Sequence, residues 1–345
     1  MAERLADHTT LRVGGPARNW VEPGTEAELI DVVRAADAAG EPVLVLGGGS
    51  NVVVADAGFD GTVVHTGRLR GVHTEDVAAC SGAFVNVAAG EPWDAFVAAT
   101  VAAERVGVEA LSGIPGLVGA TPIQNVGAYG QEVSQTIARV RVWDRQEQRV
   151  VTRSAAECHF GYRSSLFKAV PDRFVVLSVS FQFALGTLSA PVRYAELARV
   201  LGVEPGARAP LAEVREAVLE LRRGKGMVLD AADRDTWSAG SFFTNPVVDP
   251  ALADALPGDA PRYPQPDGRV KTSAAWLIEH AGFNRGYGSG LARLSTRHTL
   301  AVTNRGGASA ADIVALAREI RDGVRHAYGI SLVPEPVLIA TTLDP

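Results

Sequence analysis

Cysteine and clustered histidine, the residues that most often build disulfide frameworks and zinc sites, are scarce in this sequence. Its 345 residues include two cysteines, Cys80 and Cys158, in unrelated contexts, and its seven histidines form neither an HExxH nor an HxH pattern. We therefore expect no disulfide framework and no metal site. Any redox chemistry would have to use an organic cofactor.

Net positive charge and long apolar runs are also lacking. The net charge is −6 with interspersed signs, so no basic stripe favours nucleic acid, although a local cationic pocket for an anionic ligand stays open. No segment is long and apolar enough to span a bilayer, and the N-terminus lacks a signal-peptide pattern. We expect a cytoplasmic protein of two or three domains without nucleic acid or membrane insertion.

Glycine, in contrast, is concentrated in residues 111–130, LSGIPGLVGATPIQNVGAYG, which we call the central glycine stretch. It has five glycines, two prolines and no charged side chain. Glycine permits positive φ and close approach of the backbone, so amides here can face a flat anionic cofactor. A series of tight turns at a domain boundary accounts for this composition equally well.

A second glycine segment, the GGGSN loop of residues 47–51, follows an apolar strand at 42–46 and precedes a β-branched run at 52–54. This β-loop-β order lacks the helix that follows the glycines of a Rossmann fingerprint or a P-loop. Successive amides, with the Ser50 hydroxyl and the Asn51 amide, would bind a pyrophosphate. A glycine hairpin is the alternative.

The remaining pattern is that of an α+β protein without internal repeats. Two capping pairs, Thr25 with Glu28 and Ser309 with Asp312, predict the starts of helices. We expect further helices over 93–101, over 211–221 and up to residue 282, and strands over 84–88, 140–144, 149–152, 174–183 and 331–342.

Arg163 is the most informative single charge. It lies in a polar turn, GYRSSLFK, beside Leu166 and Phe167. An arginine next to an apolar anchor is usually a snorkelling surface residue, whereas its functional interpretation is a bidentate clamp for a carboxylate or phosphate.

Seven motifs occur in a fixed order along the chain. They are TTLRVGGPA at 9–17, GGGSN at 47–51, IPGLVGATPIQNVGAYG at 114–130, YRSS at 162–165, GSFFTNP at 240–246, AAWLIEHAG at 274–282 and PEPVLI at 334–339. Together they resemble the UDP-N-acetylenolpyruvoylglucosamine reductase (MurB) family over essentially the full chain. RYAEL, which contains Tyr194, is similar to the tyrosine loop of the type I branch.

The resemblance implies an α+β fold, with an FAD-binding unit of the vanillyl-alcohol-oxidase (PCMH) type made of two subdomains, and a C-terminal substrate-binding domain. The implied boundaries are 1–69 for the first subdomain, completed by 337–345, then 70–229 for the second and 230–336 for the substrate domain. Tyr194 would act as a lid over the sugar nucleotide.

The implied reaction is the NADPH-dependent reduction of UDP-N-acetylglucosamine enolpyruvate to UDP-N-acetylmuramate through FAD. This is an early cytoplasmic step of peptidoglycan synthesis, and thus of cell-wall growth, cell shape and division. We expect non-covalent FAD, because neither glycine segment contains the histidine or cysteine needed for a linkage. We also expect a monomer.

The resemblance assigns roles by position. Ser241 would donate the proton, while Arg163 and Glu335 would hold the enolpyruvyl carboxylate and stabilise the intermediate. Residues that would contact the sugar nucleotide are Tyr162, Tyr194, Lys225, Asn245, Tyr263, Lys271 and His298. Residues that would hold FAD are Gly47, Gly48, Gly49, Ser50, Asn51, Gly113, Ile114, Pro115, Gly116, Gly119, Ala120, Thr121, Gln124, Asn125, Gly127, Ala128 and Tyr129.

Other interpretations stay open. On local sequence alone, Ser241 and Glu335 would be ordinary turn residues. Thr244 stands where many members have lysine and His298 where some have glutamine, which weakens the inferred diphosphate and carboxylate contacts. The alternatives are an FAD-dependent oxidase on the same scaffold, and a nucleotide-sugar-binding module that has lost its flavin.

Overall fold

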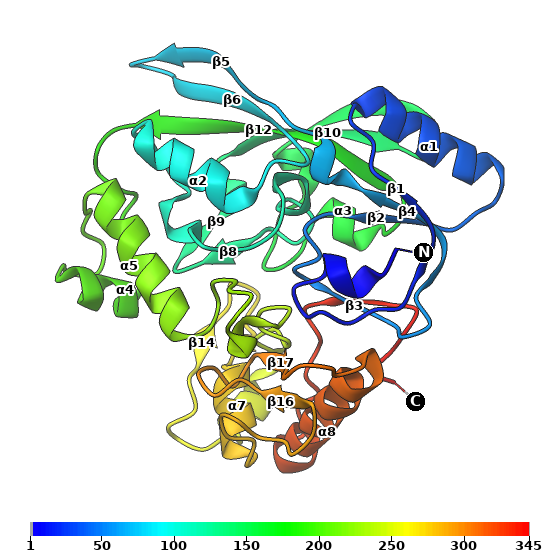
Figure 1. The fold of residues 1–345 in the computed structure, drawn as a ribbon. Helices are drawn as coiled ribbons and strands as arrows, with labels where there is room; N and C mark the ends of the chain where they lie inside the picture. The colour runs from blue at the N-terminus through cyan, green and yellow to red at the C-terminus, as the bar shows by residue number, and fades with distance from the viewer. Residues whose placement is uncertain (1–2, 345) are drawn as a thin grey trace. The chain divides into compact units, whose positions relative to one another are not determined.

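The computed structural model describes residues 3–344, which form two compact units (Figure 1). Unit 1 contains residues 3–16, 49–59 and 229–344, and unit 2 contains residues 17–48 and 60–228. The boundary between the units crosses the GGGSN loop, so that Gly48 belongs to unit 2 and Gly49 to unit 1.

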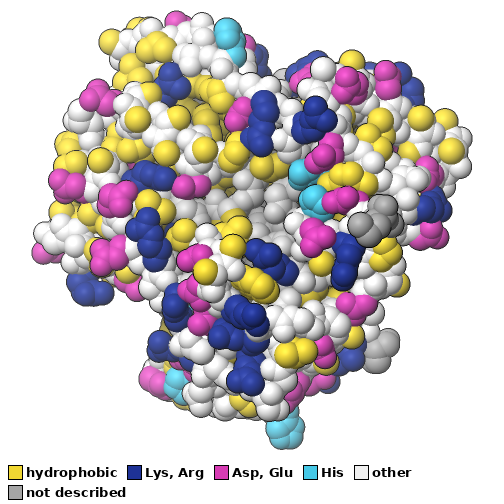
Figure 2. Space-filling model, viewed as in Figure 1, with side chains coloured by type: hydrophobic (Ala, Val, Ile, Leu, Met, Phe, Trp, Pro, Cys, Tyr) yellow, Lys and Arg dark blue, Asp and Glu magenta, His cyan; other side chains and the backbone are white. Residues whose placement is uncertain are grey.

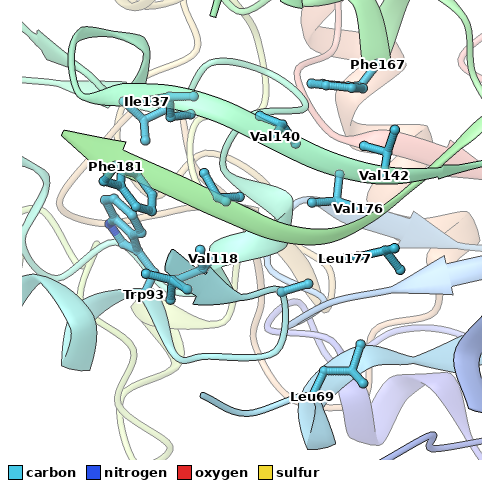
Figure 3. Packing of buried hydrophobic residues seen from close by; sticks show 14 of the residues in the cluster. Leu69, Trp93, Val118, Ile137, Val140, Val142, Phe167, Val176, Leu177 and Phe181 are labelled. Atoms are coloured by element: carbon cyan, nitrogen blue, oxygen red, sulfur yellow. The ribbon is translucent and has the colours of Figure 1, made fainter. Parts of the chain in front are cut away.

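A six-stranded antiparallel sheet is the largest element of unit 2. Its order is β11-β10-β12-β6-β5, with β7 paired to β12. The strands are β5 (Val72–Ala78), β6 (Gly82–Ala88), β7 (Arg105–Val106), β10 (Ile137–Asp144), β11 (Arg149–Ser154) and β12 (Phe174–Leu185). Apolar side chains of β10 and β12 pack with Trp93, at the start of α2 (Trp93–Ala102), in the buried cluster of Figure 3.

The rest of unit 2 comprises a smaller sheet, short helices and a hairpin. The smaller sheet has the order β1-β4-β2, in which β2 and β4 are parallel. Its strands and the remaining elements are β1 (Ala17–Val21), α1 (Glu26–Ala38), β2 (Val43–Leu46), β4 (Phe59–His65), β8 (Gly127–Ala128), β9 (Gln131–Glu132), α3 (Leu166–Ala169), α4 (Ala195–Leu201) and α5 (Leu211–Gly224), with 3-10 helices at Thr66–Arg68, Glu109–Leu111, Val118–Ala120, Val133–Gln135 and Ala156–Cys158.

Unit 1 has a core in which α8 (Ala310–Tyr328) packs against α7 (Ala274–His280) and the hairpin of β16 (Ala292–Leu294) and β17 (Val302–Asn304). A three-stranded sheet has the order β13-β15-β14, and β3 pairs in parallel with β18. The remaining bounds are β3 (Val52–Val54), β13 (Val247–Val248), α6 (Pro250–Asp254), β14 (Tyr263–Pro264), β15 (Val270–Lys271), β18 (Val337–Ile339) and 3-10 helices at Leu5–His8 and Arg234–Thr236.

Both predicted capping pairs start helices, but the glycine-hairpin alternative is wrong. The Thr25 side chain accepts from the Glu28 amide ahead of α1, and Ser309 with Asp312 forms a reciprocal capping box ahead of α8. Strands β2 and β3 flank the GGGSN loop without pairing with each other, because β2 pairs with β4 and β3 with β18. The loop therefore connects two different sheets.

Figure 2 shows basic and acidic side chains interspersed over the visible face. Within residues 3–344, no group of three or more His, Cys, Asp and Glu side chains is arranged to hold a metal ion. Among the helices of the same residues, none has both the length and the apolar character required to cross a membrane.

Candidate functional site

The GGGSN loop contacts the central glycine stretch backbone to backbone. A Cβ added to Gly48 would lie 2.7 Å from the Gly116 Cα, whereas one added to Gly47 would come no closer than 3.7 Å to the Ala120 Cβ. Only glycine therefore fits at position 48. Within the described chain, the amide of Gly48 donates to no other residue, so it remains available to a bound anion. This narrow approach with an unused amide fits the phosphate-bearing part of a dinucleotide.

The central glycine stretch is fixed by the segment that leads into α2. The amides of Val118 and Gly119 donate to the carbonyls of Glu91 and Ala89, and a Cβ on Gly119 would lie 2.5 Å from the Ala89 Cβ. Because these amides are already used, the 3-10 turn can offer a bound cofactor its surface but not these two donors. The prediction that the glycine amides of this stretch face a bound group is thus wrong for the amide of Gly119.

Asp94 holds the opposite end of this stretch. Its Oδ1 accepts from the amide of Gly113 at 2.6 Å, and its two oxygens accept from the Arg215 guanidinium at 2.7 and 2.9 Å. Burial opposes the charged form, but the bonds from Arg215 and Gly113 outweigh burial and lower the pKa of Asp94. The carboxylate thereby fixes Gly113, whose φ of +71° places it in the left-handed region.

Arg163 lies against the far end of the stretch. Its Nη2 donates to the Gly127 carbonyl at 2.7 Å, and its φ is +51°. The Arg163 carbonyl accepts from Lys168 Nζ at 3.1 Å. Asn125, also at positive φ, donates to the carbonyl of Gly161 at 3.1 Å in the same turn. These contacts constrain both the backbone and the guanidinium of Arg163, which an ordinary snorkelling arginine does not require.

Tyr129, Tyr194 and Lys225 come together in unit 2. The two tyrosine rings meet edge to face at 5.4 Å, and Lys225 Nζ lies 5.6 Å from the centre of the Tyr129 ring. Lys225 also donates to Glu196 in the first turn of α4, directly after Tyr194. Burial raises the pKa of Tyr129 to about 12, so its hydroxyl stays protonated.

In unit 1, backbone bonds pair the segment of Glu335 with Phe242 and Phe243, which follow Ser241 in the chain. Phe243 forms an antiparallel bridge with Pro334, and the amide of Glu335 donates to the carbonyl of Phe242 at 2.9 Å. The Asn51 side chain donates to the Glu335 carbonyl at 3.3 Å. Ser241 itself follows Gly240, whose φ of +75° turns the chain sharply. We refer to residues 238–244 as the Ser241 loop.

The other predicted sugar-nucleotide residues of unit 1 form two groups. Tyr263 and Lys271 are cross-strand neighbours in the sheet β13-β15-β14, and the Asn245 side chain accepts from the Ala274 amide at the start of α7. His298 lies in the turn between β16 and β17. Buried Asp235 fixes that turn by accepting from the backbone and side chain of Thr296 at 2.9 and 2.7 Å.

The predicted catalytic residues are divided between the units. Arg163 belongs to unit 2, and Ser241 and Glu335 to unit 1. Sequence reasoning missed the polar residues that support these positions. Asp94, Asp235 and Asn304 carry no local signal, because their partners lie 19, 61 and 293 residues away.

Comparison with known proteins gives consistent matches. The family model of the UDP-N-acetylenolpyruvoylglucosamine reductase C-terminal domain matches residues 232–339, and that of an FAD binding domain matches residues 17–153. The UDP-N-acetylenolpyruvoylglucosamine reductase of Cutibacterium acnes is 61% identical over 342 residues, covering 98% of this chain and 90% of that protein. The Thermobifida fusca reductase is 56% identical over 351 residues, covering 98% and 97%.

A solved structure agrees over the full length. The crystal structure of the UDP-N-acetylenolpyruvylglucosamine reductase from Thermus caldophilus superposes with a TM-score of 0.65 at 25% sequence identity, covering 98% of this chain and 99% of that chain. Together with the two family models, this match confirms the predicted α+β fold class, with its FAD-binding unit and C-terminal domain.

Proposed function

The chain belongs to the UDP-N-acetylenolpyruvoylglucosamine reductase family, and from this premise we propose how its residues divide the work of the reaction. The protein is an FAD-dependent oxidoreductase that uses NADPH to reduce UDP-N-acetylglucosamine enolpyruvate in peptidoglycan synthesis. The comparisons do not favour the oxidase alternative. When bound, FAD accepts reducing equivalents from NADPH and passes a hydride to the enolpyruvyl group.

The glycine cradle holds the cofactor. The observation that carries this proposal is the backbone contact of Gly48 with Gly116, which only glycine permits and which brings the two glycine segments together beside the Gly48 amide. Ser50 and Asn51 extend the loop with polar side chains. The remaining residues assigned to FAD in the sequence follow one another along the central glycine stretch, and we propose that they line the same cofactor without a covalent bond.

Ser241 supplies the proton that completes the reduction. Hydride addition to the terminal enolpyruvyl carbon leaves negative charge on the neighbouring carbon, delocalised into its carboxylate. A positioned general acid contributes about 10²–10⁴ in rate. The sharp turn at Gly240 and the backbone pairing of Phe242 with Glu335 support a fixed position for the Ser241 hydroxyl. Glu335 would share a proton when it faces the substrate carboxylate.

Arg163 binds the enolpyruvyl carboxylate and stabilises the charge that develops there. Its guanidinium is permanently charged and forked, which suits a carboxylate. One Nη2 hydrogen bond to Gly127 fixes the orientation of the fork beside the cofactor stretch. A preorganised donor of this kind is worth about 10²–10³ in rate.

We assign the sugar-nucleotide contacts within each unit separately. Tyr194 and Lys225 form one contact group, and both lie against the ring of Tyr129, which we assign to FAD. Residues of the second group, in unit 1, are Asn245, Tyr263, Lys271 and His298. Tyr162, which is 41% exposed beside Arg163, completes the binding surface, and Tyr194 acts as a lid.

We keep the three-domain division of 1–69 with 337–345, 70–229 and 230–336 as a proposal. The parallel pairing of β3 with β18 supports joining the C-terminal segment to the first subdomain. The separate sheet β1-β4-β2 supports the first subdomain itself. We further propose that the protein works as a cytoplasmic monomer and thereby serves cell-wall growth, cell shape and division.

The test is an anaerobic flavin spectrum of the purified protein. We expect a yellow protein whose FAD absorbance is bleached by NADPH and restored by UDP-N-acetylglucosamine enolpyruvate. UDP-N-acetylglucosamine, which lacks the enolpyruvyl group, is the matched control and should leave the flavin reduced. Rapid reoxidation by air, with none by the enolpyruvyl substrate, would establish the oxidase instead. A colourless protein that binds the sugar nucleotide would indicate a binding module.

A further inference from the structure

The TTLRVGGPA motif at residues 9–17 has no role in the proposed chemistry, yet its threonine Thr10 joins two parts of the site in unit 1. The Thr10 amide donates to the Gly49 carbonyl at 3.1 Å, in the GGGSN loop. Its hydroxyl donates to the Ser238 carbonyl at 2.7 Å, at the start of the Ser241 loop. Thr10 is buried, with 7% of its surface exposed.

Ser238 connects the hydrogen bond from Thr10 to the turn that carries Ser241. The Ser238 hydroxyl accepts from the Gly240 amide at 3.2 Å. This bond links the first residue of the turn, Ser238, to the residue that precedes Ser241. The Phe242 amide, directly after Ser241, donates to the Leu300 carbonyl at 2.7 Å. The Ser241 backbone therefore lies between two fixed points, of which the Thr10 hydroxyl holds the first.

The other side of the anchor is equally constrained. A Cβ on Gly49 would lie 1.9 Å from the His8 carbonyl oxygen, so the threonine segment packs directly on the GGGSN loop. Buried Asn304 donates to the carbonyls of Leu11 and Arg12 at 3.1 and 3.2 Å. The segment that carries Thr10 thus has little freedom to move with respect to either loop.

We infer that Thr10 is a positioning residue for the proton donor, because its amide and hydroxyl set the register between the cofactor loop and the Ser241 loop. Proton transfer needs hydrogen-bond reach, and a misplacement of about 1 Å costs about 10²-fold in rate. The inference rests on the proposed function of Ser241. It concerns only the second half of the reaction, since flavin reduction by NADPH does not use the Ser241 hydroxyl.

Thr9 provides a matched control. It is buried like Thr10, at 6% exposure, but its hydroxyl donates to Val13 within the same segment, at 3.0 Å. Thr9→Val and Thr10→Val therefore remove the same group from adjacent buried positions. Only the second removes a bond to the Ser241 loop. Thr10→Ser keeps the donor and should restore the wild-type behaviour.

The experiment measures both half-reactions of the FAD-loaded variants by anaerobic stopped-flow spectroscopy. In Thr10→Val we expect flavin reduction by NADPH near the wild-type rate, and reoxidation by the enolpyruvyl substrate slower by about tenfold or more, up to the roughly 10²-fold of a 1 Å displacement. The solvent deuterium isotope effect on reoxidation should increase. Independently of turnover, amide hydrogen exchange of residues 238–241 should be faster in Thr10→Val than in Thr9→Val.

Each other outcome contradicts the inference in a distinguishable way. Equal slowing of both half-reactions, or loss of FAD, in Thr10→Val would make Thr10 a scaffold residue. Failure of Thr10→Ser to restore reoxidation, or an equal effect in Thr9→Val, would also overturn it. If the wild-type flavin were not reoxidised by the enolpyruvyl substrate, the proposed function itself would fail. If only Ser241→Ala lost reoxidation, the function would stand and the role of Thr10 would be wrong.

Discussion

The central glycine stretch of unit 2 and the Ser241 loop of unit 1 are both irregular, but they are held by different means. In the glycine stretch, main chain contacts main chain, as when Gly48 meets Gly116 and the Gly119 amide bonds Ala89. Around the Ser241 loop, side chains donate to carbonyls that are distant in sequence, as the Thr10 hydroxyl does to the Ser238 carbonyl. We therefore expect an added side chain to disrupt the central glycine stretch. The Ser241 loop should be disrupted when a side chain is shortened or loses its hydrogen-bonding group.

The largest effect should come from adding one methyl group to the glycine cradle. Gly48→Ala would place a Cβ 2.7 Å from the Gly116 Cα, and overpacking of this kind costs about 1–3 kcal/mol. We expect the purified variant to retain no FAD, measured as flavin absorbance per chain. Gly186→Ala, outside the assigned site, is the control, because its Cβ would make an ordinary 3.8 Å contact with the Val106 side chain. Equal FAD content in the two variants would refute the cradle.

Removing the Ser241 hydroxyl tests the other region. Ser241→Ala should bind FAD and be reduced by NADPH normally, while reoxidation by substrate slows by about 10²–10⁴ because the general acid is lost. Stopped-flow traces of the two half-reactions measure this ratio. Ser309→Ala, which removes the cap of α8, should cost about 0.5–2 kcal/mol of stability without changing the ratio. Equal slowing of both half-reactions in Ser241→Ala would show that Ser241 only shapes the site.

Arg163 combines the two modes, because its side chain bonds the main chain of the glycine stretch. Arg163→Lys should lower kcat/KM for the enolpyruvyl substrate by about 10²–10³, since an ammonium cannot reproduce the forked contact. FAD content should not change. Arg149→Lys, in an exposed ion pair with Glu147, should behave like the wild type. Turnover at the wild-type level in Arg163→Lys would exclude the assigned role.

The smallest effect concerns acid stability. The pKa of Asp94 is depressed in the fold, so its contribution is complete above the ordinary value of 3.8 and is lost as pH falls through the folded value. Its side chain is 39% exposed, which limits the contribution to less than about 1 kcal/mol. Denaturant titration should show Asp94→Asn less stable than the wild type at neutral pH, with the difference vanishing in acid.

Asp60→Asn provides the control for this measurement. The Asp60 side chain is 90% exposed in its ion pair with Arg18, so the variant should match the wild type at both pH values. A constant difference between wild type and Asp94→Asn across the acid range would show that the Asp94 charge does not support Gly113.

Sequence patterns predicted the parts of this fold that depend on near neighbours. The capping box of Ser309 and Asp312 and the apolar periodicity that follows define α8 locally. The exposed strand β5 was missed, because it has no buried alternation to reveal it. The sequence left the hairpin alternative for the GGGSN loop open, since the partner of β3 is β18, 285 residues later.

The candidate site divides in the same way. Because glycines can be read directly from the sequence, the two glycine segments already indicated a possible cofactor cradle. Thr10, Asn304 and Asp235 are polar residues of common types whose importance arises from partners elsewhere in the chain. Only the folded structure brings those partners together.

The pairing of β3 with β18 also has a consequence for the order of events during synthesis. The GGGSN loop leaves the ribosome early, yet the strand after it gains its parallel neighbour only when Val337–Ile339 has been made. At about 5–20 residues per second, that interval lasts roughly 15–60 s. Throughout this time β3, the strand that follows the loop, lacks the neighbour that it has in the folded structure.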